Sequence, residues 1–236
     1  MEWRNKKLTL PAVYVLTVGI LVLAILWGSR AVTVISESLP LARSHCIIID
    51  PGHGGIDGGA TSCSGKLESQ INLEIALRLN DLMHLLGYDT GMIRTTDISV
   101  YTKGDTIAQK KISDLKERAR IVNETENALL VSIHQNTYPD ARYSGAQVFY
   151  SRKEDSVTLA KQLQAAFTAV LNKGSKRQCK PAEGVYLMEH IDCTGVLIEC
   201  GFLSNQQEEA LLRDASYQKK LCCVIASTLS IYLSNT

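Results

Sequence analysis

The chain has 236 residues, of which 45% are hydrophobic and 21% are charged. These proportions are typical of a folded globular protein and differ from those of disordered or collagen-like chains. Its 25 Lys and Arg residues nearly balance its 24 Asp and Glu residues, so the formal net charge is +1. That balance gives no basic footprint for nucleic acid and argues against DNA binding.

Residues 1–30 differ in composition from the rest of the chain. Positive charges, including Arg4, precede an uncharged stretch from Leu8 to Ser29, which has the length of ~20 residues that a membrane-spanning helix needs. A cleaved signal peptide usually has an apolar region of only ~7 to 15 residues, so the segment is interpreted as an uncleaved anchor. The charges before it place the remainder outside the cytoplasm. Cleavage near Ser29 or Ala31, which would release a secreted protein, is the alternative.

Residues 31–44 are interpreted as a linker, and residues 45–236 as one domain of ordinary size. Cys46 to Asp50 is a short β-branched run typical of a buried strand, and Pro51 and a glycine-rich loop end it. A helix is predicted next, because apolar side chains recur every three or four residues up to Gly87, a typical C-cap residue. The apolar positions of this helix are Leu67, Ile71, Ile75, Leu79, Leu82 and Leu86.

The remaining chain alternates between predicted strands and predicted helices. Strands are expected at residues 88–94, 128–134, 146–150, 185–188 and 195–199. Helices are expected around the apolar positions Ile112, Leu115, Ala119 and Val122, around residues 159–171, and around residues 217–232. The inner strands are apolar on both faces, which is typical of a parallel sheet between helices. The predicted fold class is therefore α/β: a single domain with a largely parallel central sheet flanked by helices, preceded by the N-terminal transmembrane helix.

Seven cysteines, an odd number, leave at least one thiol unpaired within the chain. Cys46 and Cys200 lie in strand-like apolar runs, and Cys222 and Cys223 lie in a helical run. These cysteines are interpreted as small buried hydrophobic residues rather than as zinc ligands, since no Cys-x-x-Cys spacing occurs. Because strand side chains alternate, Cys200 is expected to point away from the face that carries Glu199.

Polar side chains stand where predicted strands end, and ligands of α/β sheets bind at the carboxyl ends of the strands. His53 follows the first strand, His134 closes another, and Glu199 closes a third. Glu68 lies near the start of the first helix, which leaves the same edge. Two imidazoles and one carboxylate can hold a catalytic zinc ion with a position left for water. The other carboxylate is then free to act as a base, so these residues indicate an exported metallohydrolase without identifying its substrate.

Five blocks of residues occur in a characteristic order. They are Ile49–Ala60 (IDPGHGGIDGGA), Glu68, Arg94–Asp97 (RTTD), Ser132–Asn136 (SIHQN) and Leu197–Asn205 (LIECGFLSN). Over residues 46 to 234 the chain resembles the zinc-dependent N-acetylmuramoyl-L-alanine amidases of the Amidase_3 family. The resemblance implies a twisted central sheet, one Zn²⁺ ion, and hydrolysis of the amide between N-acetylmuramic acid and the L-alanine of the peptidoglycan stem peptide. It places the metal ligands on His53, Glu68 and His134, and the catalytic glutamate on Glu199.

Further side chains near these blocks are candidates for supporting roles. Asn136, two residues after His134, can orient substrate or close the strand as a turn residue. Arg177 lies in a basic segment, where its guanidinium can bind a stem-peptide carboxylate or remain a solvated loop charge. Asp50 and Asp57 are candidate partners of the imidazoles or caps of the loop.

The short chain, its anchor and the SIHQN and ECGFLSN segments resemble the germination-specific spore-cortex branch of the family. That resemblance implies a role in cortex maturation towards muramic δ-lactam, an activating lipoprotein partner, and a location in the forespore intermembrane space. Two alternatives share the zinc chemistry: a vegetative cell-wall amidase and an exported zinc peptidase. An alternative of another class is a catalytically inactive wall-binding protein. The presence of all four site residues argues against this alternative.

Overall fold

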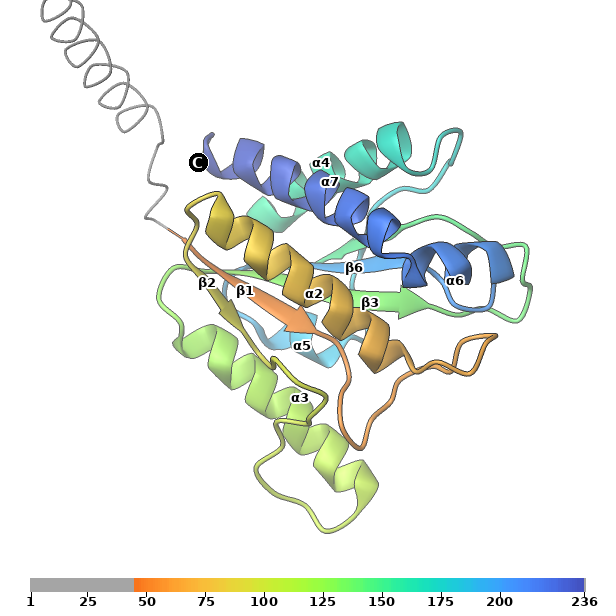
Figure 1. Ribbon diagram of the computed structural model, residues 1–236. Helices are drawn as coiled ribbons and strands as arrows, with labels where there is room; N and C mark the ends of the chain where they lie inside the picture. Colours follow the sequence, from red (N-terminus) through yellow and green to blue (C-terminus); the bar gives the residue numbers. More distant parts are fainter. Residues whose placement is uncertain (1–44, 236) are drawn as a thin grey trace, which may run out of the picture. The chain divides into compact units, whose positions relative to one another are not determined.

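Figure 1 shows the chain as a computed structural model, which describes residues 45–235. The predicted anchor at residues 1–30 and the predicted linker at residues 31–44 lie outside the described residues, so both stay predictions. Within residues 45–235, no helix combines the length and the apolar character needed to cross a membrane.

The described chain forms a 6-stranded sheet flanked by helices. The strands are β1 (Cys46–Pro51), β2 (Thr90–Met92), β3 (Ala128–Asn136), β4 (Gln147–Tyr150), β5 (Lys180–Pro181) and β6 (Thr194–Phe202). The helices are α2 (Glu68–Leu85), α3 (Ile107–Glu124), α4 (Glu154–Val170), α5 (Tyr186–His190), α6 (Gln206–Arg213) and α7 (Ala215–Leu233). The strand order is β2-β1-β3-β6-β4-β5, and every pairing is parallel except that of β4 with β6. The predicted α/β class with a largely parallel sheet is therefore confirmed.

The two faces of the sheet carry different side chains, because successive residues of a strand point to opposite faces. We call the face covered by α2, α4 and α7 the core face (Figure 1), and its side chains are apolar: Ile47, Ile49, Leu129, Val131, Ile133, Val196, Ile198 and Cys200. We call the face covered by α3 and α5 the site face, and its apolar set includes Ile48, Leu130 and Leu197. Towards the carboxyl ends of the strands, the side chains of the site face become polar: Asp50, Ser132, His134 and Glu199.

Helix α2 forms as its apolar spacing predicts, and it places one site residue. Ile71, Ile75 and Leu79 are fully buried against the core face. Gly87 follows the helix with a φ of 85°, and its N–H donates to the carbonyl of His84, as expected of a glycine C-cap. The helix begins at Glu68, so the packing of its apolar stripe fixes this carboxylate at the edge of the sheet.

The prediction of a strand at residues 185–188 is wrong, since these residues enter the short helix α5. Leu187 and Met188 are buried in the apolar cluster of the site face. The apolar run there is too short for its periodicity to distinguish a strand from a buried helical turn. Helix α6 and the two-residue strand β5 had no predicted counterpart.

Helix α3 is confirmed, but its predicted apolar stripe is only half buried. Ala119 and Val122 are buried, whereas Ile112 and Leu115 are 55% and 38% exposed. Arg118 is buried in their place, with 2% of its surface exposed. The helix therefore turns a charged side chain towards the sheet, and the next subsection gives the acceptors of that side chain.

Candidate metal centre

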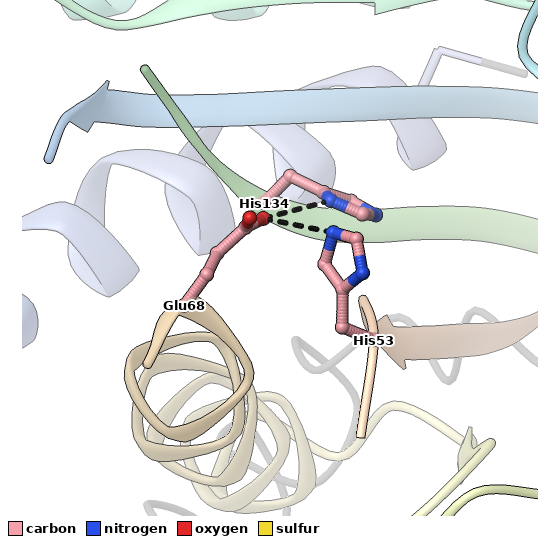
Figure 2. Close-up of side chains that lie close together, drawn as sticks. All are labelled: His53, Glu68 and His134. Carbon is pink, nitrogen blue, oxygen red and sulfur yellow. Dashed lines mark hydrogen bonds and ion pairs between the residues drawn. The ribbon is translucent and has the colours of Figure 1, made fainter. Parts of the chain in front are cut away.

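Three of the predicted site residues meet at the carboxyl edge of the sheet, as Figure 2 shows. His53 comes from the loop after β1, Glu68 from the start of α2 and His134 from β3. Glu68 Oε1 lies 3.3 Å from His53 Nε2 and 3.1 Å from His134 Nδ1. Donor atoms held at ~2.0 to 2.1 Å around a tetrahedral zinc ion lie ~3.3 Å apart. The separations of Glu68 from both imidazoles therefore fit a shared metal ion.

Glycines allow these side chains to approach one another. A Cβ atom on Gly52 would lie 2.1 Å from His134 Nε2, and one on Gly59 would lie 2.6 Å from Glu68 Oε2. His53 itself has a φ of 59°, a left-handed conformation that side chains other than glycine rarely adopt. The glycine-rich loop is thus a tight turn that aims His53 at the centre and leaves room for the other two side chains.

The carboxylate of Glu68 is buried, and both of its oxygens accept hydrogen bonds. Its Oε2 accepts a hydrogen bond from the Ala60 N–H at 3.0 Å, and its Oε1 accepts one from the Gln135 N–H at 3.2 Å. Burial alone would raise the pKa of Glu68, but the hydrogen bonds and charges of His134 and His53 hold this pKa far below its usual range. Glu68 is therefore ionised, which is the state in which a carboxylate binds a metal.

A chain of polar contacts orients His53. Its Nδ1 lies 2.9 Å from Asp57 Oδ2, and Lys111 Nζ lies 2.8 Å from Asp57 Oδ1. Burial alone would lower the pKa of His53, whereas Glu68 and Asp57 raise it to about 9. A carboxylate bonded to the ring nitrogen that does not face the metal fixes the tautomer and the orientation of a metal-binding imidazole. Asp57 stands in that position, on Nδ1 of His53.

Two buried guanidinium groups hold the backbone of the His53 loop. Arg118 donates to the carbonyls of Pro51 at 3.0 Å and His53 at 2.7 Å. Arg94 donates to the carbonyls of Gly52 at 3.0 Å and His53 at 2.8 Å. These donors satisfy carbonyls that the left-handed turn withdraws from regular structure.

Sequence reasoning placed Arg94 within a family block but missed Arg118. The signal that could have found Arg118 is its position one helical turn before the buried Val122, on the same face of α3. Arg118 also pairs with Asp50, whose Oδ2 accepts from Ser132 Oγ at 2.6 Å. Asp50 therefore supports the loop through Arg118.

Glu199 lies on β6 directly opposite His134 in the strand register. The two side chains and His53 line one cavity of about 300 Å³. Glu199 Oε2 is buried and has no hydrogen-bond partner within residues 45–235. Burial, with the charge of Glu68, raises the pKa of Glu199 to about 7 against the opposing effect of His134 and His53. A carboxylate with a pKa near neutrality is suited to accept and return a proton.

The structure does not bring the two predicted substrate-binding residues into this group. Asn136 ends β3, and its backbone carbonyl accepts from the Leu203 N–H at 2.8 Å. Arg177 lines a different cavity, where its Nε donates to the Ser144 carbonyl and its Nη1 to Gln147 Oε1, both at 2.7 Å. Neither residue lines the 300 Å³ cavity.

The cysteines lie apart from the centre. Cys200 is fully buried in the cluster of the core face, so the predicted orientation away from Glu199 is confirmed. All seven cysteines are free thiols. Cys222 is buried as expected, but Cys223 is exposed, so its interpretation as a buried hydrophobic residue is wrong. Consecutive positions of a helix lie ~100° apart, and α7 buries one of them against the core face.

The chain is similar to known proteins over nearly all of its described length. The family model for N-acetylmuramoyl-L-alanine amidase matches residues 47–230. The germination-specific N-acetylmuramoyl-L-alanine amidase of Bacillus subtilis is 38% identical over 200 residues, which cover 84% of this chain and 83% of that protein. The N-acetylmuramoyl-L-alanine amidase LytC of the same organism is 29% identical over 79% of this chain, and the match spans 35% of LytC.

Solved structures of amidases also resemble the chain. The CwlD amidase from Clostridioides difficile, solved in complex with the GerS lipoprotein, matches with a TM-score of 0.77 and 39% identity over 81% of this chain and 99% of that one. An N-acetylmuramoyl-L-alanine amidase from Clostridium difficile 630 matches with a TM-score of 0.70 and 28% identity over 82% of this chain and 98% of that one.

Proposed function

The chain belongs to the N-acetylmuramoyl-L-alanine amidase family, and from that premise we propose that it is a metal-dependent amidase of spore-cortex peptidoglycan. The bond cleaved joins the lactyl group of N-acetylmuramic acid to the L-alanine of the stem peptide. The observation that carries the proposal is the meeting of His53, Glu68 and His134 at one edge of the sheet, with Glu199 on the neighbouring strand.

The donor set of this group fits one zinc ion. Two imidazole nitrogens and one carboxylate oxygen form a set that catalytic zinc sites use, and such sites keep a fourth position for water. When bound, zinc supplies Lewis-acid chemistry: it polarises a carbonyl and makes a water molecule more acidic. His53, Glu68 and His134 would hold the ion, and Asp57 would keep the His53 ring in position.

The remaining chemistry falls to Glu199. Its Oε2 has no hydrogen-bond partner within the described chain, and Glu199 lines the cavity that His53 and His134 also line. Glu199 accepts the proton of the attacking water and later donates it to the nitrogen of the leaving L-alanine. A carboxylate whose pKa is about 7 serves both steps, because neither its ionised nor its neutral form is strongly disfavoured near neutral pH.

The cortex role rests on the similarity to the germination-specific amidase, with which the chain shares 38% identity over most of both lengths. In that role the cleavage exposes muramic acid for conversion to muramic δ-lactam. Hydrolysis of the vegetative cell wall and peptidase activity are the alternative functions of the same site. A catalytically inactive wall-binding protein is the alternative of another class, and the free Glu199 Oε2 disfavours it.

The proposal includes a partner and a location. The solved CwlD amidase is in complex with a lipoprotein, and a lipoprotein activator is proposed here on that similarity. Residues 1–30, which lie outside the described residues, would anchor the chain with its catalytic domain outside the cytoplasm, in the forespore intermembrane space. Release by cleavage after this segment is the alternative.

Digestion of purified peptidoglycan tests the function. The full chain is incubated with spore-cortex or vegetative peptidoglycan, with and without a chelator, and the released peptides are identified by mass spectrometry. Chelator-sensitive release of intact stems that begin with L-alanine, faster from cortex, supports the proposal. Cleavage inside the stem would move the protein to the peptidases. No release from metal-loaded protein, with or without a lipoprotein partner, would favour the binding-only alternative.

A further inference from the structure

A second cavity, of about 760 Å³, is rich in positive charge. Four cationic side chains line it, namely Arg142, Lys176, Arg177 and Lys180, whereas the lining includes one carboxylate, Asp140. Asp140 is already paired with Arg142 at 2.7 Å. Lys176 and Lys180 form no ion pair with any carboxylate in the described part of the chain. We call this cavity the basic pocket.

One buried side chain of the basic pocket lies on the strand next to that of Glu199. Gln147 faces Glu199 across the β4–β6 pairing and is 5% exposed. Its Oε1 accepts from Arg177 Nη1 at 2.7 Å, and its Nε2 donates to the Gln178 carbonyl at 2.9 Å. Strand β5 begins two residues after Gln178 and lies two strands from β6 in the sheet. Because neighbouring strands are ~4.8 Å apart, Lys180 on β5 lies ~10 Å from the strand of Glu199.

Arg177 is held in place before any ligand arrives. Its guanidinium lies 4.6 Å from the centre of the Phe202 ring, and its Nε donates to the Ser144 carbonyl. The Nη2 group donates no hydrogen bond to any described residue. A fixed guanidinium with a free donor group binds a carboxylate at little cost in side-chain entropy.

We propose that the basic pocket binds a carboxylate of the stem peptide, about three residues beyond the scissile amide. An extended peptide advances ~3.3 to 3.6 Å per residue, so three residues span the ~10 Å between the strand of Glu199 and Lys180 of the basic pocket. The glycan strand is built of uncharged N-acetyl sugars, so the cations select the peptide side of the substrate. This assignment rests on the proposed function, because it takes the scissile amide to lie beside Glu199.

Binding measurements on the full chain with Glu199→Gln test the proposal without turnover. The probe is a fluorescent muramoyl tripeptide with free carboxylates, compared with the same tripeptide carrying carboxamides. We expect the acidic tripeptide to bind about tenfold more tightly in 50 mM salt, an amount typical of two exposed ion pairs. The preference should shrink in 500 mM salt, because screening weakens exposed pairs.

Paired charge-removing variants locate the effect. Lys176→Gln with Lys180→Gln should reduce the preference for the acidic tripeptide, and Arg177→Gln added to this pair should abolish it. The control, Lys219→Gln with Lys220→Gln, removes the same charge from the exposed surface of α7 and should leave the preference intact. Equal binding of the two tripeptides by the unsubstituted pocket, or a preference that survives loss of Lys176, Arg177 and Lys180 together, would overturn the proposal. So would displacement of the tripeptide by an equal concentration of inorganic phosphate, which would indicate a general anion site.

Hydrolysis by the wild-type chain separates this proposal from the function. Release of stems that begin with L-alanine, without a carboxylate preference in binding, would reject the role of the basic pocket and support the amidase function. A carboxylate preference without any hydrolysis by metal-loaded wild type would support carboxylate binding by the basic pocket and reject the amidase function.

Discussion

The two faces of the central sheet are made by the same strands and serve different ends. On β3, Leu129, Val131 and Ile133 point to the core face and are fully buried, whereas Ser132 and His134 point to the site face. Strand β6 repeats this division, with Ile198 and Cys200 on one face and Glu199 on the other. Alternate residues of these strands therefore form either the hydrophobic core or the polar candidate site. Function lies where the site face stops being apolar, near the carboxyl ends of the strands.

The energetics of the two faces differ in the same way. Each large apolar side chain of the core face contributes roughly 1.5 to 3 kcal/mol by leaving water. The site face instead buries the charged side chains of Asp50 and Arg118 and the Oε2 atom of Glu199, and a buried charge lowers stability unless it is paired. Asp50 and Arg118 pair with each other, but Glu199 Oε2 has no partner in residues 45–235. Substitutions on the core face should change stability, and those on the site face should change metal binding or catalysis.

The largest expected effect is on catalysis, from Glu199→Gln. An amide cannot accept the proton of water, so kcat should fall by ~10²- to 10⁴-fold, the usual contribution of a general base. The variant should keep its metal and its unfolding temperature, since the side chain keeps its shape. Rates of stem release and metal content by mass spectrometry check both points. Full activity in this variant would remove Glu199 from its proposed role.

The next effect is on stability, from Phe167→Ala in α4. Phe167 is fully buried in the core-face cluster, and the cavity left behind should lower the free energy of unfolding by about 3 to 5 kcal/mol. Denaturant titration measures the loss, and the metal content of the folded fraction should not change. Leu85→Ala is the control, because Leu85 is 82% exposed and its loss should cost less than about 0.5 kcal/mol. A stable Phe167→Ala protein that fails to bind metal would break the division between the faces.

The sequence predicted most of the fold and the members of the metal group, for a physical reason. The core-face stripe of α2 and the apolar runs of β1, β3 and β6 follow regular periods. Parallel strands bring their carboxyl ends to one edge, so polar residues that end different strands meet there. His53, Glu68, His134 and Glu199 could be selected by this argument, and the family resemblance supplied a role for each.

The remainder depended on tertiary contacts that no local pattern records. Arg118 has the spacing of a core position but the chemistry of a surface residue, and only the carbonyls of the His53 loop explain its burial. Residues 185–188 are apolar in a run too short to show a period, and they form a helix. Arg177 bonds to Gln147, and Gln147 is paired with Glu199 in the sheet, so three segments that are distant in sequence lie together there.

A smaller effect is expected at the edge of the metal group, from Asp57→Asn. The substitution keeps the size and shape of the side chain, but the neutral amide cannot hold the His53 ring with a charged acceptor. Loss of such a partner typically lowers metal affinity by ~10- to 100-fold. Competition with a chelator of known affinity measures this change. Unchanged affinity would mean that the glycine-rich loop alone orients His53.

The smallest effect is expected for Cys200→Ala, next to Glu199 in sequence but on the core face. Removing one buried sulfur should cost about 1 kcal/mol of stability, comparable to one buried methylene group. The rate of stem release should stay within about twofold of wild type at equal metal content, because the thiol faces away from the cavity. Loss of hydrolysis with metal retained would place Cys200 in the reaction and contradict the assignment of the two faces.

The most direct test is the metal content of purified wild type, Glu199→Gln and His134→Ala, measured together with stem release from cortex peptidoglycan. The account predicts one zinc ion per chain in wild type and in Glu199→Gln, loss of that zinc in His134→Ala, and hydrolysis by wild type alone. Stoichiometric zinc in a folded His134→Ala variant, or hydrolysis that continues after the zinc is removed, would contradict it.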